Sequence, residues 1–204
     1  MDYFKKVKLP VTPPLKDKRV FTEVSFGYDV YDAKEVLTDE ILETFKELEL
    51  EPTIVVIFSD NDESKGEKDR LIHTDIFKTK SGWKIMKFGI NWELGDSTTL
   101  FSWWDMKTLK EVYPDDSKLF PFKFYKLSGI HYVNRRQLGI PEEAEKLAET
   151  YIEGPTLVRT DIPHMTVYSG SGIRRGMSIR FNETNISSWD DIVEKLKNKG
   201  VLEN

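Results

Sequence analysis

The chain has 204 residues and three histidines, and one of these histidines stands two positions before an aspartate. The pair is His73 and Asp75, in the segment LIHTD. On an extended strand, side chains at positions i and i+2 point the same way, so the imidazole and the carboxylate converge on one point. A second imidazole, His164, lies on a later apolar and β-branched run. Together the three side chains are a set of ligands suited to a divalent metal.

This ligand set predicts a particular metal chemistry. Two histidines and one carboxylate on three corners of an octahedron leave the other corners open, which is the facial triad of non-haem Fe(II) oxygenases. The His-x-Asp pair is not specific alone, because 35 of the 204 residues are acidic. The metal-site interpretation is supported further by His164 and by Arg174, which stands ten residues beyond it. We interpret His131 as structural, because no acidic residue stands two positions from it.

The stretch 160–181 carries the distal histidine and a basic strand after it. Glycine and serine alternate at 169–172, which predicts a tight hairpin turn, since glycine supplies the positive φ that such turns need. We therefore expect a histidine and an arginine to face each other across this hairpin. One face of the returning strand carries Arg174, Gly176, Ser178 and Arg180.

Hydrophobic periodicity predicts the elements around these residues. Helical spacing at Thr38–Leu50 and a capping pattern at 188–199 indicate helices, and Pro141–Tyr151 is rich in Ala, Glu and Lys and opened by proline, which predicts a third. The segment Trp83–Leu94 alternates cleanly and predicts one continuous strand. Further strands are expected at 20–30, 53–58, 100–106, 119–127 and 129–133. The fold class is therefore mainly β with flanking helices, as in a β-sandwich or jelly roll.

Composition places limits on the class of protein. The length fits one domain over 1–204, with a jelly-roll core at about 53–182, an N-terminal arm at 1–19 and the C-terminal helix. A formal net charge of −5 gives no strong nucleic-acid signal. With no cysteine, a metal site must use His and carboxylates. The sequence lacks a signal-peptide pattern and a membrane-length apolar run, so we expect a soluble, cytoplasmic protein.

The order of these motifs resembles a known family. H-x-D is followed by KFGINWEL and STTLFSWW, then by DIPH and a strand ending RRGMSIRF. This order resembles the 2-oxoglutarate/Fe(II)-dependent oxygenases, most closely their small phage- and bacteria-borne members and more loosely the aspartyl/asparaginyl β-hydroxylases. The resemblance covers about Thr53–Phe181. It implies a double-stranded β-helix, which is a cupin-like jelly roll of two sheets.

The resemblance also implies roles for particular residues. His73, Asp75 and His164 would bind Fe(II), and Arg174 would pair with the far carboxylate of the co-substrate 2-oxoglutarate. Ser178 and Asn91 are assigned to the same co-substrate pocket. Some branches of the family have a serine two residues after the arginine, where this chain has Gly176. The double arginine leaves the choice among Arg174, Arg175 and Arg180 open.

The sequence thus predicts a dioxygenase that uses O2 and hydroxylates a small molecule or a peptidyl side chain. Two other classes of protein stay open. One is a non-catalytic jelly-roll module with a binding or phage structural role, and the other is a cupin-type metalloenzyme without 2-oxoglutarate, for which Arg174 would be dispensable. A complete set of metal ligands favours the enzyme. The sequence carries no motif that identifies the substrate or the oligomeric state.

Overall fold

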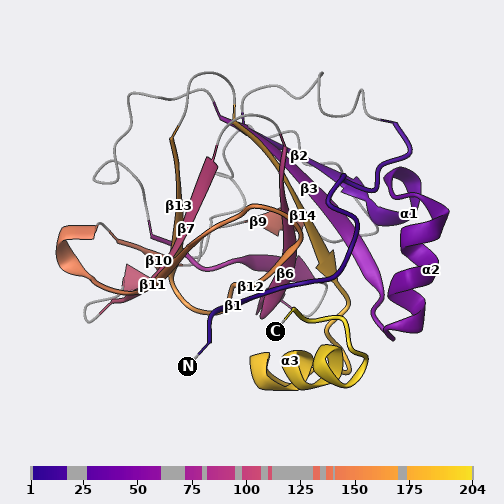
Figure 1. Cartoon of the computed structure of the whole chain (residues 1–204). Coiled ribbons are helices and arrows are strands. Elements are labelled where there is room, and N and C mark those ends of the chain that lie inside the picture. Colours follow the sequence, from indigo (N-terminus) through magenta and orange to yellow (C-terminus); the bar gives the residue numbers. More distant parts are fainter. Residues whose placement is uncertain are drawn as a thin grey trace.

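The computed structural model describes residues 2–17, 27–60, 72–79, 82–94, 98–106, 110–111, 131–133, 137–139, 141–169 and 174–203. Within these ranges the fold is mainly β, with antiparallel sheets and a few helices (Figure 1). The layers follow one another across Figure 1, with strands β7, β11 and β13 on the left, a larger sheet in the middle and helices α1 and α2 on the right.

The larger sheet has six strands in the described part of the chain, in the order β1-β12-β6-β14-β3-β2, and every neighbouring pair is antiparallel. At its centre, Ser178 of β14 lies opposite Asn91 of β6 and Val56 of β3. The strands are β1 (Phe4–Lys6), β2 (Gly27–Asp32), β3 (Pro52–Asp60), β6 (Phe88–Leu94), β12 (Thr156–Arg159) and β14 (Arg174–Phe181).

The remaining strands form smaller sheets. The strand order β11-β7-β13 joins β7 (Thr98–Asp105), β11 (Glu145–Tyr151) and β13 (His164–Ser169). The order β5-β4-β9 joins β4 (Ile76–Thr79), β5 (Gly82–Ile85) and β9 (His131–Val133), and β8 (Lys110–Glu111) pairs with β10 (Gln137–Leu138).

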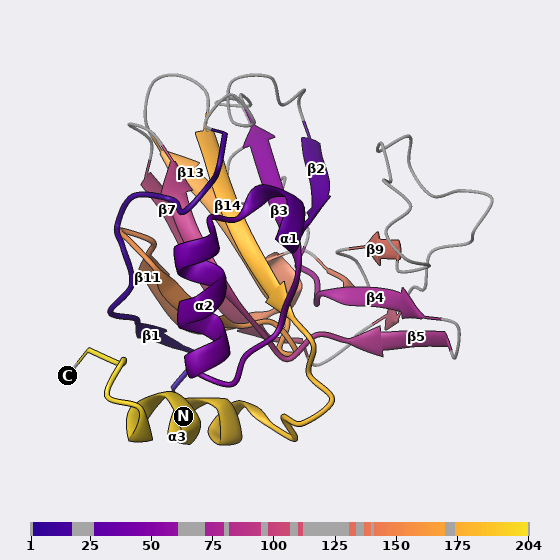
Figure 2. The same cartoon turned by 90° about the vertical axis from the view of Figure 1, so that its right-hand side faces the viewer.

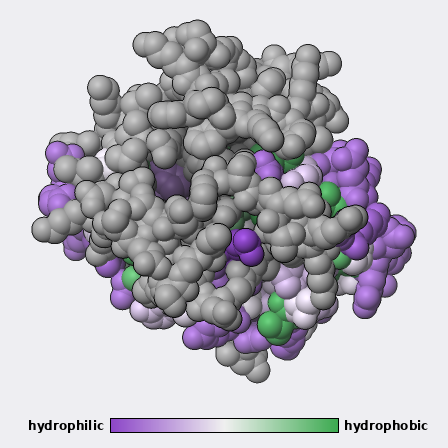
Figure 3. All heavy atoms as spheres, turned by 90° about the horizontal axis from the view of Figure 1, so that it is seen from above, coloured by the Kyte–Doolittle hydropathy of each residue, from purple (hydrophilic) through white to green (hydrophobic). Residues whose placement is uncertain are grey.

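Short polar caps start the helices. The Thr38 hydroxyl accepts a hydrogen bond from the Ile41 N–H at the start of α2 (Asp39–Glu47), and the Ser188 hydroxyl does the same for Asp191 at the start of α3 (Trp189–Asn198). The short helix α1 covers Ala33–Val36, and η3 is a 3₁₀ turn at Pro141–Glu143. Hydrophilic side chains gather over α1 and α2 on the right of the molecule seen from above (Figure 3).

Strand alternation gives the six-stranded sheet two different faces. One face carries apolar residues such as Ile57, Ile90 and Ile179, which pack with residues of α2 and α3 in the main core. In that core the rings of Phe45 and Phe181 meet edge to face, with their centroids 5.1 Å apart. Figure 2 shows α2 in front of this sheet, with β7 and β11 on the other side.

The opposite, inner face of the six-stranded sheet is more polar. It carries Ser178 and Arg180 of β14 and faces the β11-β7-β13 sheet, because Val158 of β12 packs with Phe101 and Trp103 of β7. Of the predicted site residues, Ser178 and Asn91 lie on this face, and His164, which stacks on Phe101, faces it from β13.

Two predicted elements were wrong. The segment 141–151 is not a helix, because Glu145–Tyr151 forms strand β11 and pairs with β7 along its length. The segment 83–94 is not one strand, because Met86 and Lys87 interrupt it and their backbone groups bond outside the sheets. The expected strand at 119–127 and residues 20–26 of another lie outside the described residues.

The predicted hairpin around 169–172 was also wrong. Strand β13 pairs with β7, whereas β14 pairs with β3 and β6, so the two strands belong to different sheets. Residues 170–173 lie outside the description. The histidine of β13 and the arginines of β14 therefore belong to different sheets. Among the helices of the described residues, none combines the length and apolar character that a membrane crossing requires.

Candidate metal centre

The two predicted histidine ligands lie directly opposite each other. The N–H of His73 donates to the carbonyl of His164 at 2.9 Å, and the N–H of His164 donates to the carbonyl of His73 at 2.8 Å. This reciprocal pair is a single antiparallel bridge, which places both side chains on the same side of the backbone. The imidazole ring centroids lie 4.7 Å apart, with the planes inclined by 54°.

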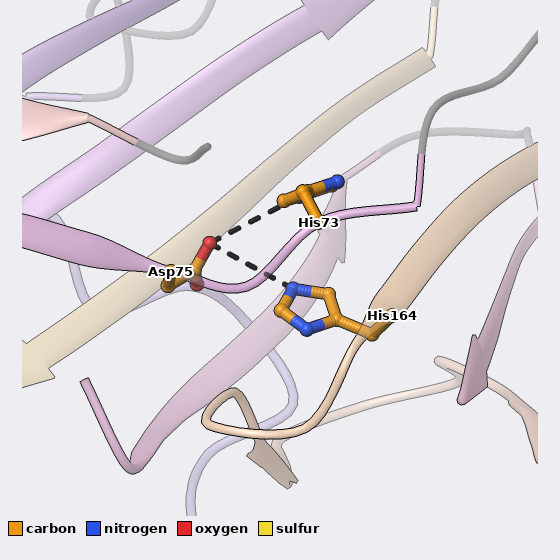
Figure 4. A group of neighbouring side chains, drawn as sticks. All are labelled: His73, Asp75 and His164. Carbon is orange, nitrogen blue, oxygen red and sulfur yellow. Dashed lines mark ion pairs between the residues drawn. The ribbon is translucent and has the colours of Figure 1, made fainter. Parts of the chain in front are cut away.

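Asp75 completes the group, and all three side chains point toward one another (Figure 4). Its Oδ1 lies 4.0 Å from Nε2 of His73 and 3.7 Å from Nε2 of His164. One ligand atom from each residue lies within 4.8 Å of the other two. With metal–ligand bonds of about 2.0–2.2 Å, ligand atoms lie about 3 Å apart. Small side-chain rotations are therefore enough for the three residues to hold one ion.

The imidazole of His164 is oriented by contacts on its far side. Its Nδ1 lies 2.9 Å from the carbonyl oxygen of Ile162 and donates to it, so Nε2 keeps its lone pair for the site. The ring also stacks on Phe101, with centroids 5.0 Å apart and planes inclined by 20°. His164 is buried and His73 is half-buried. This is the tautomer and the fixed ring that a metal ligand requires.

The positive partner of Asp75 is Arg180, which reaches it from the inner face of β14. The guanidinium Nη2 forms an ion pair with Oδ2 of Asp75, and both side chains are buried. Gly89 makes room for this contact, because a Cβ at that position would overlap the Arg180 guanidinium. Oδ1 is thus turned toward the histidines while Oδ2 is held by Arg180.

The protonation state of Asp75 follows from these contacts. Burial alone would raise the pKa of the carboxyl, but the positive charge of Arg180 outweighs burial and holds the pKa well below its usual range. Asp75 is therefore an ionised carboxylate at neutral pH. That is the form in which a carboxylate binds a metal.

The other predicted residues lie at different places around this centre. Ser178 and Asn91 are buried on the inner face, where the Ser178 hydroxyl donates to Oδ1 of Asn91 at 2.5 Å. Arg174 begins β14 opposite Asp60, but its side chain lies outside the described part of the structure. Strand alternation places Arg175 on the opposite face of β14. The backbone of His131 lies in β9, and its side chain is likewise not described.

The sequence did not decide which of Arg174, Arg175 and Arg180 lies at the site. Arg180 stands six residues beyond Arg174, which is about 20 Å along a strand, so the two cannot reach the same point. The structure brings Arg180 to Asp75, because β14 belongs to the six-stranded sheet and Arg180 lies on the inner face of that sheet. Strand alternation in the sequence places Arg180 on the same face as Ser178. The sequence does not show which strands pair with β14, so the contact of Arg180 with Asp75 could not be predicted.

Comparison with family models, with curated proteins and with solved structures finds no match to this chain. The interpretation of the site therefore depends on its own geometry.

We expect Asp75→Asn to reduce the affinity for Fe(II) more than about 100-fold, since losing even an outer partner of a metal ligand costs about 10–100-fold. Anaerobic calorimetric titration measures the change. Asp161→Asn is the matched control, because this nearby carboxylate pairs with Arg159 instead, at 2.7 Å. Wild-type affinity in Asp75→Asn, or an equal loss in the control, would contradict a centre built on Asp75.

We expect Arg180→Met to destabilise the metal-free protein by about 3–5 kcal/mol at neutral pH, because it leaves a buried carboxylate without its positive partner. The pH dependence should also change sign. In the wild type, the lowered pKa of Asp75 contributes stability above its unfolded-state pKa of about 3.9, and this contribution is lost as the pH falls through the folded-state value.

In Arg180→Met, burial becomes the dominant influence and raises the folded-state pKa of Asp75. Stability should then fall as the pH rises from about 4, the usual value for an aspartate. Urea unfolding across the acidic range measures both effects. The control is Arg159→Met, which breaks a more exposed pair and should cost at most about 1 kcal/mol. Parallel pH profiles for wild type and Arg180→Met would refute the assigned pairing.

Proposed function

We propose that this protein is an Fe(II)- and 2-oxoglutarate-dependent oxygenase on a double-stranded β-helix. The observation that carries the proposal is the group formed by His73, Asp75 and His164, in which two imidazoles and one ionised carboxylate converge between two antiparallel sheets. This donor set suits Fe(II) and leaves coordination positions open for other ligands. A jelly roll is the arrangement of two packed antiparallel sheets in which such a site would lie.

The charge of the centre supports an anionic co-substrate. A divalent metal, the Asp75 carboxylate and the Arg180 guanidinium together carry a net charge of about +2 when both histidines are neutral. Such a charge in a buried site calls for negative ligands. The dianion 2-oxoglutarate supplies two negative charges. This balance favours the oxygenase over a cupin-type enzyme that uses no acidic co-substrate.

The inner face of β14 supplies a path for that co-substrate. Arg180, Ser178 and Arg174 alternate along this face away from the metal ligands, and Asn91 lies opposite Ser178 on β6. Arg174, the residue to which the sequence assigned the far carboxylate of 2-oxoglutarate, stands six residues before Arg180 on this strand, about 20 Å away. Because Arg180 contacts Asp75, Arg174 is too distant to bind a keto acid whose other end lies on a metal beside Asp75. Ser178 and Asn91 lie nearer to Arg180 and would line the co-substrate pocket.

The metal and the keto acid would supply the oxidising chemistry, in which O2 converts 2-oxoglutarate to succinate and CO2 and leaves an oxygen atom for the substrate. The residues of the chain would bind, orient and shield. His73, Asp75 and His164 hold the ion, and the apolar ring of Phe101 beside His164 limits the access of water. Retention of Asp75 favours hydroxylation over halogenation, which in this family gives up the carboxylate ligand. The substrate class is a small molecule or a peptidyl side chain.

Anaerobic protein mixed with Fe(II) and 2-oxoglutarate should develop the weak visible charge-transfer band of an iron-chelated keto acid. His164→Ala should abolish the band, because it removes a ligand, and Ser178→Ala should weaken it at subsaturating 2-oxoglutarate, because it removes a polar group from the inner face of β14. Arg175→Ala is the control, since this arginine lies on the opposite face of the strand. It should leave the band unchanged.

Other results would select the alternatives. Metal binding without the band would favour a cupin-type metalloenzyme without 2-oxoglutarate. Absence of metal binding would refute the oxygenase and leave a non-catalytic binding module.

A further inference from the structure

The ligand Asp75 lies in a segment that the sheet ladders do not hold. His73 forms the bridge to His164, and β4 begins at Ile76, so Thr74 and Asp75 lie between two paired regions. The backbone of Asp75 is nevertheless fixed on both sides. Its N–H donates to the carbonyl of Thr160 at 3.2 Å, and its own carbonyl accepts from the N–H of Met86 at 2.9 Å.

Thr160 connects these two contacts into a closed ring. Its N–H donates to the carbonyl of Lys87 at 2.9 Å, and its hydroxyl donates to the carbonyl of Met86 at 2.8 Å. Thr160 has no exposed surface, so water does not compete for these bonds. Four hydrogen bonds thus join Asp75, Met86–Lys87 and Thr160.

Glu183 secures this ring from its other side. The N–H of Lys87 donates to both carboxylate oxygens of Glu183, at 2.9 and 3.1 Å, and the N–H of Phe88 donates to Oε1 at 3.3 Å. Every backbone donor and acceptor of Met86 and Lys87 is therefore bonded to Asp75, Thr160 or Glu183. These bonds replace the strand that the sequence pattern predicted here.

This ring of hydrogen bonds connects the segments that carry Asp75 and His164. Thr160 stands four residues before His164 on the same segment, and it holds the backbone of Asp75 directly. A shift of Thr160 would therefore change the position of the carboxylate relative to both imidazoles. Metal affinity is sensitive to such shifts, because the geometry of ligands is set by the residues that support them.

We propose that Thr160 is a positioning residue of the metal centre, and that its hydroxyl, backed by Glu183, fixes the backbone of Asp75 at the distance from His73 and His164 that one ion requires. This inference rests on the proposed metal site and assigns to Thr160 and Glu183 a role that the ligands themselves do not define.

The test compares Thr160→Val and Thr160→Ser with Thr156→Val, using Co(II) as the probe and the metal-free protein as the stability reference. Thr156 is the matched control, because it is equally buried and its hydroxyl donates to a backbone carbonyl, that of Gly154, at 2.9 Å. Thr160→Val should weaken Co(II) binding about 10–100-fold and alter its d–d absorption spectrum. Thr160→Ser should restore both, and Thr156→Val should change stability only.

Glu183 provides a second pair of variants should Thr160→Val fail to fold. Glu183→Gln keeps an oxygen acceptor for the Lys87 N–H and should bind Co(II) like the wild type, whereas Glu183→Ala should bind it more weakly. Wild-type affinity and spectrum in both Thr160→Val and Glu183→Ala would overturn the inference, as would equal losses in Thr160→Val and Thr156→Val. If the inference fails in this way while the wild type binds Co(II), the proposed metal site still stands. If the wild type binds no metal, both the metal site and the positioning role of Thr160 are refuted.

Discussion

Asp75 is an ionised carboxylate buried between two sheets, and its charge has to be balanced within the protein, because an isolated buried charge costs several kcal/mol. The balance comes from Arg180, which belongs to the six-stranded sheet, while His164 belongs to the β11-β7-β13 sheet. The centre therefore joins the two sheets through one carboxylate. The contact between Arg180 and Asp75 also requires Gly89, because any side chain at that position would displace the guanidinium.

The alternation along β14 serves the core and the site at once. Met177, Ile179 and Phe181 point into the apolar core beneath the helices, while Ser178 and Arg180 point into the space between the sheets. A register shift of one residue would move a buried arginine into the apolar core and expose its hydrophobic neighbours to the polar interior. The packing that stabilises the fold thus also fixes the side of the sheet on which the charged residues lie.

The candidate ligands could be read from the sequence, but their surroundings could not. The i, i+2 spacing of His73 and Asp75 predicted that their side chains would converge, and the structure brings His164 to the same point. The contact of Arg180 depends on which strands pair with β14, which is information that no local pattern carries. The helix predicted at 141–151 failed because pairing with β7 overrode a helical composition. The interruption at Met86–Lys87 arises from hydrogen bonds to distant residues, so alternation alone could not predict it. The co-substrate role predicted for Arg174 does not fit the contact of Arg180 with Asp75, because the two arginines stand about 20 Å apart along β14.

The proposed metal centre requires that one ion binds between His73, Asp75 and His164. A crystal structure of the protein soaked anaerobically with Mn(II), in place of Fe(II), would locate the ion by its anomalous scattering. We expect one strong peak about 2.0–2.3 Å from an imidazole nitrogen of each histidine and from Oδ1 of Asp75, with Arg180 still paired with Oδ2. Ordered density for these three side chains with no peak between them, at a metal concentration that saturates other carboxylate sites, would contradict it.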